Sequence, residues 1–312
     1  MPYLSTIIAA RLKAKKEAVD KLRPLPPSAV KKLQEQFRLE MTYNSNAIEG
    51  NSLTLKETFL VINEGITVKG KPLKDHLEAK DHYAALEYLY DLVERDKQYT
   101  ISERLIRSLH QMIVQETEKE QAGKYRTANV YIAGSKHTPP GAFEVPRLME
   151  QLLSWLKRQA KTTTTVELAA LFHHTLVSIH PFFDGNGRTA RLAMNLILMR
   201  DGYPLSIILK QDRKKYYTVL ARADAGQFGP LVNFIAQTVE RSFDIYLKTL
   251  APEKVKERLL TLNQLSKGTS YSAKYLNLLA RQGKLEAYKE GRNWLSSREA
   301  LGRYLQNRER KK

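Results

Sequence analysis

The chain has no cysteine among its 312 residues. This absence excludes disulfide bonds, cysteine-ligated zinc and a cysteine nucleophile. The chain also lacks an apolar run long enough to cross a bilayer, and its opening residues Met1-Pro2-Tyr3 are not typical of a signal peptide. From these absences we expect a cytoplasmic protein with no membrane partner.

Acidic residues are scarce relative to basic ones. The chain has 51 Lys and Arg against 33 Asp and Glu, which gives a net charge of +18. Residues 251–312 hold 15 of the basic and 6 of the acidic side chains, so half of the net charge lies in the last fifth of the chain. Such an excess favours nucleic acids, nucleotide phosphates or acidic proteins as partners.

Chemically useful residues are concentrated in His180–Arg191, whose sequence is HPFFDGNGRTAR. The helical spacing of apolar residues over 166–179 predicts a helix, and Pro181 should end it. His180 then stands at a helix end beside a loop. The glycines of the sequence Gly185-Asn186-Gly187 allow successive N–H groups to point at one anion.

A second helix should follow this loop, because apolar residues recur on one face after Arg191. Its N-terminus would face the loop, where the peptide dipoles favour a phosphate. Arg188 and Arg191 are three residues apart, so they share a helix face and can both bind phosphate oxygens. Asp184 lies at the loop mouth, where a carboxylate beside phosphates suits Mg²⁺.

The stretch 180–191 resembles the Fic signature H-x-F-x-[D/E]-G-N-G-R-x-x-R at every defined position. Fic-domain proteins typically transfer AMP from ATP to a hydroxyl of a target protein. The resemblance implies that His180 takes the proton of the attacking hydroxyl, that Asp184 holds Mg²⁺, and that Phe182 anchors the loop. It also implies a phosphate site, with an anion hole formed by Gly185, Asn186 and Gly187 and outer phosphates held by Arg188 and Arg191.

An upstream motif, Ser45-Asn46-Ala47-Ile48-Glu49-Gly50, lies at the end of a predicted helix of about residues 28–49. Ser28 is the expected N-cap of this helix, and Gly50 should end it. A carboxylate at a helix C-terminus is disfavoured by the dipole unless another group holds it. The motif resembles the family's inhibitory pattern [S/T]-x-x-x-E-[G/N]. This implies that Ser45 and Glu49 are inhibitory and that Glu49 pairs with Arg191, where it would block the γ-phosphate.

Two further regions are matched to the family more loosely. Val130-Tyr131-Ile132 is a β-prone run followed by a turn at Gly134-Ser135. In Fic proteins this region, through Thr138, is a flap hairpin that docks the target by backbone pairing; a plain surface hairpin is the alternative. Tyr217 and Asp224 fall where the family lines an adenosine pocket, although Tyr216 and Tyr217 could simply pack their helix.

Residues 251–312 are predicted to form a separate small domain. Lys254–Leu265 and Ala273–Arg281 read as helices, Leu285–Tyr288 and Asn293–Leu295 as strands, and Arg298–Gln306 as a last helix. This order is typical of a winged helix-turn-helix, and the sequence resembles excisionase-like domains. The resemblance implies DNA phosphate contacts by Lys274, Arg281, Lys284, Lys289 and Arg292. A basic module that packs on the catalytic part or binds a protein is the alternative.

The expected fold is mainly α: a Fic-type helical bundle with a short β-hairpin flap, plus a small C-terminal winged helix-turn-helix. Helical spacing predicts further helices over Leu73–Arg95, Ser102–Gln115 and Val145–Gln159, and Thr54 should open another with a capping box. The expected domains are residues 1–98, an N-terminal helical region with the inhibitory helix; 99–250, the Fic catalytic core; and 251–312.

These features predict an autoinhibited protein adenylyltransferase. It would use ATP and Mg²⁺ to modify a Tyr, Thr or Ser hydroxyl of a target protein and of itself. Two alternatives stay open: an enzyme that uses the same site and Glu49 to remove AMP, and a DNA-binding regulator whose Fic domain is vestigial. The resemblance also implies a homodimer.

Overall fold

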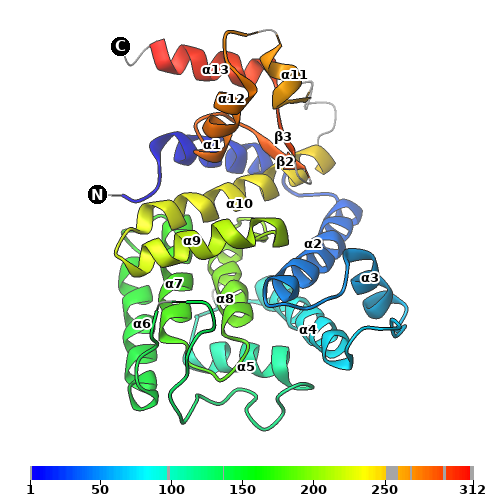
Figure 1. Cartoon of the computed structure of the whole chain (residues 1–312), viewed down its shortest axis with the longest axis vertical. Coiled ribbons are helices and arrows are strands. Elements are labelled where there is room, and N and C mark those ends of the chain that lie inside the picture. Colours follow the sequence, from blue (N-terminus) through cyan, green and yellow to red (C-terminus); the bar gives the residue numbers. More distant parts are fainter. Residues whose placement is uncertain are drawn as a thin grey trace.

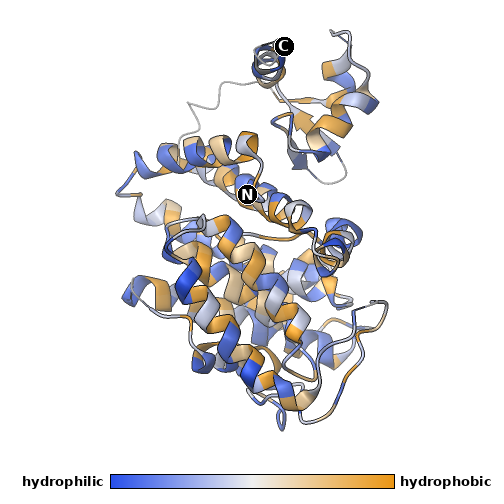
Figure 2. Cartoon of the chain, turned by 90° about the vertical axis from the view of Figure 1, so that its left-hand side faces the viewer, coloured by the Kyte–Doolittle hydropathy of each residue, from blue (hydrophilic) through white to orange (hydrophobic). Residues whose placement is uncertain are grey.

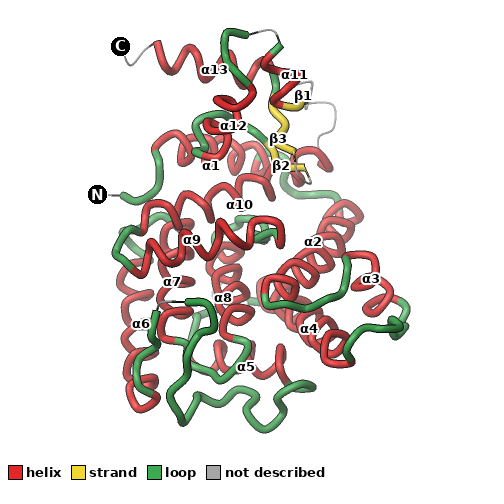
Figure 3. Tube along the Cα trace, in the orientation of Figure 1, coloured by secondary structure: helices red, strands yellow, loops and turns green. Residues whose placement is uncertain are grey.

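The computed structural model describes residues 2–96, 99–135, 137–250, 259–267, 269–290 and 293–309. Helices make up most of the described chain, and its strands lie near the C-terminal end (Figures 1 and 3). The mainly α fold expected from the sequence is therefore confirmed.

Residues before 251 form a bundle of helices. In chain order the helices are α1 (Thr6–Asp20), α2 (Pro27–Ile48), α3 (Leu55–Asn63), α4 (Leu73–Arg95), α5 (Glu103–Val114), α6 (Val145–Gln159), α7 (Thr165–Ile179), α8 (Asn186–Arg200), α9 (Arg213–Asp224) and α10 (Phe228–Leu250). Two short 3₁₀ helices, η1 (Ala142–Glu144) and η2 (Lys210–Asp212), precede α6 and α9. The predicted bounds of α4 and α6 are confirmed residue for residue.

The central helix is α8. Every residue from Arg188 to Met199 is buried, and α2, α4, α5 and α7 all contact this helix (Figure 1). Other helices of the bundle alternate hydrophobic and hydrophilic stretches along their length (Figure 2). A helix that is covered on all sides lies in the core of a domain, so the two arginines in its first turns are carried into the interior.

Local caps explain where two helices begin. Thr54 and Glu57 form the predicted capping box at the start of α3, in which each side chain accepts the other's backbone N–H. The expected N-cap of α2, Ser28, is wrong by two residues, since the helix begins at Pro27 and its N-cap is Pro26. Proline is favoured at the first helical position because an N–H there would have no helical partner.

The described residues from 259 to 309 form a C-terminal module. Its elements are β1 (Leu260–Thr261), α11 (Leu262–Ser266), α12 (Ala273–Arg281), β2 (Tyr288–Glu290), β3 (Asn293–Ser296) and α13 (Arg298–Glu309). The strands pair antiparallel in the order β1-β3-β2. The module has an apolar cluster of its own, which includes Leu262, Leu276 and Leu301.

Two expectations for this module are wrong. The sequence predicts a helix over Lys254–Leu265. Its residues up to 258 lie outside the described residues, and the described part holds β1 and the short α11 instead of one helix. The first strand of the hairpin is 288–290 rather than 285–288. The N–H of Leu285 instead bonds the Leu279 carbonyl at the end of α12, which ties this residue to the helix end.

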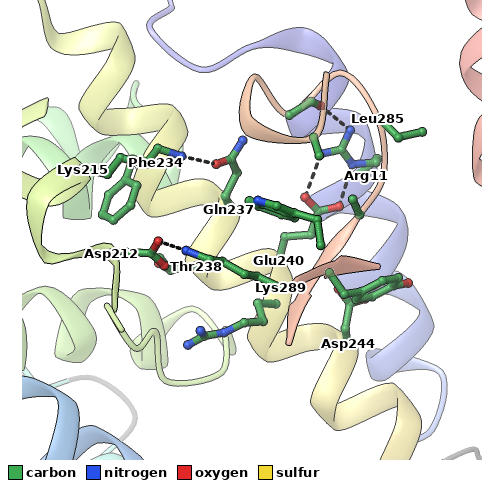
Figure 4. Close-up of a pocket in the computed structure, with 16 residues that line it drawn as sticks. Arg11, Asp212, Lys215, Phe234, Gln237, Thr238, Glu240, Asp244, Leu285 and Lys289 are labelled. Atoms are coloured by element: carbon green, nitrogen blue, oxygen red, sulfur yellow. Dashed lines mark hydrogen bonds and ion pairs between the residues drawn. The ribbon is translucent and has the colours of Figure 1, made fainter. Parts of the chain in front are cut away.

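The C-terminal module packs against α1 and α10 of the bundle. Arg11 donates to the Gly283 carbonyl at 2.7 Å, and Lys289 pairs with Asp212 of η2 across the pocket in Figure 4. Close packing continues at Gly283, where an added Cβ would lie 2.8 Å from a side-chain atom of Ile8. The module and the bundle are thus in direct contact.

The expected flap hairpin is not a paired hairpin in the structure. The described residues between 124 and 141 form no strand, although Ser135 N–H does bond the Ile132 carbonyl in a turn (Figure 3). The Arg126 guanidinium donates to the carbonyls of Ala128 and Pro140. These carbonyls bond a side chain rather than an opposing strand.

None of the described helices is both long and apolar enough to serve as a membrane span.

Candidate active site

His180 is held in a strained turn at the C-terminal end of α7. Its φ of 51° lies in the left-handed region, which is costly for a residue with a β-carbon. Arg126 supports the turn, because its Nε donates to the His180 carbonyl at 2.8 Å and its N–H donates to the Pro181 carbonyl at 2.9 Å. Sequence reasoning gave Arg126 no role at His180, from which it lies 54 residues upstream.

The His180 imidazole is suited to accept a proton near neutral pH. Its Nδ1 lies 3.4 Å from the Val177 carbonyl. Burial lowers the pKa of His180 below its ordinary value of 6.5, with Arg126 adding to the effect. The neutral form therefore predominates at pH 7, as a general base requires.

Asn186 closes the loop after His180. Its side chain accepts from the Phe182 N–H at 2.9 Å and donates to the Phe182 carbonyl at 2.8 Å. Phe182 is fully buried and stacks on His110 with ring centroids 3.7 Å apart. The Asn186 amide is therefore engaged in loop structure, so any part of this residue in an anion hole would fall to its backbone N–H.

Gly185 and Gly187 lie where their neighbours come very close to the backbone. Gly185 has a φ of 73°, and a Cβ there would lie 2.9 Å from a Val114 methyl. A Cβ on Gly187 would meet Oε1 of Glu49, the tip of that side chain. The Glu49 carboxylate thus rests against the first turn of α8, where the helix dipole attracts an anion.

Asp184 is the half-exposed carboxylate of the loop. Its Oδ1 accepts the Gly185 N–H at 2.6 Å, and its Oδ2 lies 3.5 Å from the Lys74 ammonium. Partial burial opposes ionisation, but the charge of Arg188 and the Gly185 N–H outweigh it and lower the pKa of Asp184. Sequence reasoning did not find Lys74.

Asp184 offers one carboxylate as a ligand for Mg²⁺. No group of three or more His, Cys, Asp and Glu within the described ranges could form a complete metal cage. Mg²⁺ rarely needs one, because it keeps several waters and is often held by one or two carboxylates together with substrate phosphates. An ionised carboxylate at an open loop mouth fits that mode.

Arg191 is buried and bound by the end of α2. Its Nε donates to the Ser45 hydroxyl and its Nη2 to the Ser45 carbonyl, both at 2.9 Å. Nη2 also donates to Oε1 of Glu49 at 2.7 Å. The contact between Glu49 and Arg191 that the resemblance implied is therefore present.

Arg188 is equally buried and lies between two other carboxylates. Its Nη1 is 3.2 Å from Oε1 of Glu78, and its Nη2 is 3.5 Å from Oδ1 of Asp184. Arg188 Nε and Arg191 Nη1 are buried without a hydrogen-bond acceptor among the residues that the structure describes, and Arg188 Nη1 has its ion pair with Glu78 but no well-aligned hydrogen bond. Glu78, on α4, was not singled out from the sequence.

The residues expected to line an adenosine pocket lie partly in the core and partly at the surface. Tyr216 is buried and hydrogen bonds His173 at 2.8 Å, so it packs the core. Tyr217 is 39% exposed beside the end of α2, with its hydroxyl 3.5 Å from the Ile48 carbonyl. Asp224 bonds Nε2 of His174 at 2.9 Å. Burial and the Glu49 charge raise the pKa of Tyr217, while Arg191 opposes this, so Tyr217 lies beside the Glu49–Arg191 pair. Asp224 instead binds this histidine of α7 and forms no ion pair with either arginine within the described chain.

The flap residues lie on the surface. Tyr131 is 89% exposed, Thr138 is exposed, and Val130 and Ile132 are half-buried. Their backbone groups do not pair with another strand of the described chain.

Comparisons with known proteins identify the family. A family model described as "Fic/DOC family" matches residues 100–198. A protein adenylyltransferase Fic of Aedes aegypti is 39% identical over 221 residues, which are 70% of this chain and 44% of that protein. A Nematostella vectensis protein of the same name is 37% identical over 74% of this chain and 54% of its own length. The chain thus spans about half the length of the curated relatives it matches.

Solved structures are similar over more of their length. A Fic domain containing signaling protein from Bacteroides thetaiotaomicron has a TM-score of 0.73 and 32% identity, and the match covers 80% of this chain and 99% of that one. Fic-1 from C. elegans, residues 134–508, has a TM-score of 0.71 and 30% identity over 79% of this chain and 74% of that one.

Proposed function

The chain belongs to the Fic/DOC family, and from that premise we propose that it is an autoinhibited protein adenylyltransferase. It would transfer AMP from ATP to a Tyr, Thr or Ser hydroxyl of a target protein and of itself. The observation that carries this proposal is the pair of buried guanidiniums on α8 with donors that lack acceptors. A buried donor without a partner is costly, and the oxygens of a polyphosphate would satisfy those of Arg188 and Arg191.

The chemistry follows from the placement of His180 beside this phosphate site. The hydroxyl oxygen of the target attacks the α-phosphorus while the imidazole of His180 takes the hydroxyl proton. A bond forms between that oxygen and the α-phosphorus, the bond from the α-phosphorus to the bridging oxygen of the β-phosphate breaks, and pyrophosphate leaves. Arg188, Arg191 and the N–H groups at the start of α8 stabilise the charge on the phosphates.

Mg²⁺ would be held by Asp184. When bound, it neutralises phosphate charge, which the protein's own cations do only in part. Asp184 is suited to this role because its pKa is lowered and its carboxylate is half exposed at the loop mouth.

Autoinhibition is proposed from the position of Glu49. Its carboxylate pairs with Arg191 and touches the first turn of α8 at Gly187. A γ-phosphate drawn to the same guanidinium and the same helix end would have to displace it. The turn of α2 that carries Ser45 and Glu49 would therefore hold the resting enzyme in a state that excludes productive ATP.

Removal of AMP is the second candidate, because the Glu49 carboxylate is 34% exposed and water can reach it. A carboxylate with access to water can orient it for attack on a phosphodiester. The direction of the reaction then depends on which role of Glu49 prevails.

Incubation of the protein with Mg²⁺ and either α-³²P-ATP or γ-³²P-ATP tests the proposal. Adenylyl transfer labels protein from the α-labelled nucleotide alone, and EDTA abolishes the label. Label from the γ-position would show phosphoryl transfer and would contradict the proposal. If the wild-type protein releases AMP from a pre-modified target and the Glu49→Gly variant does not, AMP removal is the activity.

For the C-terminal module we propose docking on the catalytic part, with any DNA contact confined to the exposed side of α12. Lys289, expected at a DNA phosphate, instead pairs with Asp212, whereas Lys274, Arg281 and Lys284 are exposed. Arg292 lies outside the described residues. A gel-shift titration with salt distinguishes the roles: DNA binding by exposed lysines should weaken steeply as salt rises, and Lys289→Ala should not reduce it.

A homodimer is proposed from exposed apolar side chains on α3 and the start of α4. Leu73 is 67% exposed, Phe59 42% and Leu55 41%. Exposed apolar residues that gather in one region favour association with another protein surface. Sedimentation of the full chain over a range of concentrations measures whether that surface is another copy.

A further inference from the structure

Glu78 contacts the phosphate site from the side of α4 that faces the bundle. It is 7% exposed, and its Oε1 lies 3.2 Å from Nη1 of Arg188. Its other oxygen, Oε2, accepts a hydrogen bond from Nδ2 of Asn51 at 2.9 Å. The Glu78 carboxylate therefore joins Arg188 of α8 to the residue that stands two positions after Glu49.

The same turn of α4 is bound to both flanks of Glu49. Asn46, three residues before Glu49, donates to the Glu78 carbonyl at 3.3 Å, and Asn51 donates to the Asp75 carbonyl at 3.0 Å. The Asn51 amide is itself buried. The position of Glu78 is thus fixed relative to the end of α2 as well as to Arg188.

Burial of a carboxylate such as that of Glu78 is unfavourable, because the free energy of desolvation exceeds what a surface ion pair contributes. An apolar residue in α4 would fill the space at lower cost. Arg188 has a second carboxylate nearby in Asp184, but that side chain is 46% exposed and 3.5 Å away. If Asp184 binds Mg²⁺, Glu78 is the remaining carboxylate within ion-pair distance of the Arg188 guanidinium among the described residues.

We propose that Glu78 is a positioning residue of the adenylyl-transfer site. It holds the Arg188 guanidinium in the orientation that presents its free donors to the phosphates, and through Asn51 it ties that orientation to the turn that carries Glu49. This inference rests on the proposed function. Glu78 acts on the reaction only through Arg188 and does not touch the nucleotide.

The test compares Glu78→Gln with its parent in a Glu49→Gly background, where the site is free of the inhibitory carboxylate. Glutamine keeps the size and one oxygen for Asn51 but loses the charge that faces Arg188. We expect the single-turnover rate of AMP transfer to fall about 10- to 100-fold, the range for a misplaced binding group. The Kd for ATP should change by less than about threefold, because Arg188 is still present.

Asp75→Asn in the same background is the matched control. Asp75 is a buried carboxylate on the same helix, but its Oδ2 binds the Ser52 N–H and hydroxyl and not Arg188. This variant should transfer AMP at the parental rate. Glu78→Asp keeps the charge and shortens its reach by one methylene, so it should show the rate loss of Glu78→Gln even if the glutamine variant fails to fold.

Parental rates in folded Glu78→Gln and Glu78→Asp would overturn the positioning role, as would parallel losses of rate and ATP affinity. A Glu49→Gly parent that transfers no AMP would instead contradict the proposed function. In that case the ³¹P resonances of bound ATP still report on Arg188. A shift on Glu78→Gln supports the inference, and unchanged resonances overturn it.

Discussion

Individual residues of the site take their properties from groups distant in sequence. His180 is a clear case, because burial and the Arg126 charge lower its pKa below 6.5. The active base is the neutral imidazole, so activity should be lost only as pH falls through this lowered pKa. We expect the acid limb of the pH profile of kcat/KM to lie below pH 6.5, and to be absent from the residual rate of His180→Ala.

His180→Ala itself should lower AMP transfer about 10²- to 10⁴-fold, which is the usual loss for a general base. ATP binding should be largely retained, because Arg188, Arg191 and the start of α8 hold the nucleotide. Calorimetric titration with ATP and quenched-flow labelling measure the two effects separately. Labelling at the parental rate would contradict the role of His180 as the base.

The second prediction at this scale concerns Glu49→Gly. Its Oε1 lies 2.7 Å from Nη2 of Arg191, in the place proposed for phosphate. Removing the carboxylate should raise labelling from α-³²P-ATP about 10- to 100-fold, since each 1.4 kcal/mol of lost competition shifts the productive population tenfold. Position 49 follows the last residue of α2, so glycine should cost the helix little.

Arg191→Ala is the control for this gain. It also removes the contact with Glu49, but it deletes the phosphate ligand, so it should not activate labelling alone or in combination with Glu49→Gly. If Glu49→Gly is folded by circular dichroism and shows no gain, Glu49 is not inhibitory. If AMP removal is the physiological activity, Glu49→Gly should lose that activity as well.

At the scale of elements, the sequence predicted what is local. The bounds of α4, α6 and α12 agree with their apolar spacing because such helices bury one stripe. The start of α12 also has a side-chain cap, since Ser272 accepts the Tyr275 N–H. The candidate site residues of the His180–Arg191 stretch could be predicted together because they are contiguous in the sequence. The mainly α fold followed from the same local signals.

The sequence failed where a distant side chain decides the outcome. The run Val130-Tyr131-Ile132 is β-prone, yet it forms no strand, and Arg126 binds the flanking carbonyls of Ala128 and Pro140. Glu78 and Lys74 lie on α4, more than a hundred residues before the arginine and aspartate that they contact. No sequence spacing links these α4 residues to the loop and helix that they contact. Their role could be recognised only from the packing of α4 against α8.

The C-terminal end of α2 supports a prediction at this scale. The last carbonyls of a helix lack helical partners, and the Ile48 carbonyl accepts from Arg213 Nε of α9 at 2.7 Å. Arg213→Ala should loosen the turn that carries Glu49 and raise basal labelling a few-fold, since an exposed residue such as Arg213 gains about 0.5–1.5 kcal/mol from a typical hydrogen bond. The measurement is labelling by α-³²P-ATP.

The effect of Arg213→Ala should vanish in the Glu49→Gly background, because the contact that it weakens is already gone. Lys214→Ala, at the exposed neighbouring position, should leave labelling unchanged in both backgrounds. An equal gain with and without Glu49 would show that Arg213 acts on the nucleotide and not on α2.

For the whole molecule, the packing indicates two bodies joined through charged contacts. The apolar cluster of the bundle and that of the C-terminal module share no residue. Arg11 and Lys15 of α1 contact the module at Gly283 and Glu286, but both also pair with Glu240 of α10. Those cations would keep a partner within the bundle if the module were absent.

We therefore expect a chain that ends at Leu250 to fold, to bind ATP and to retain its nucleotide chemistry. Its melting temperature should differ from that of the full chain only by the small effect of losing the contacts at Gly283 and between Lys289 and Asp212. Circular dichroism, calorimetric titration with ATP, and labelling in the Glu49→Gly background measure these three properties. Loss of ATP binding would show that the module completes the site, and loss of folding would show that the bundle is not stable without it.

Any affinity of the full chain for DNA should disappear with the module, because residues 251–312 carry half of the net positive charge and that charge supplies the phosphate contacts.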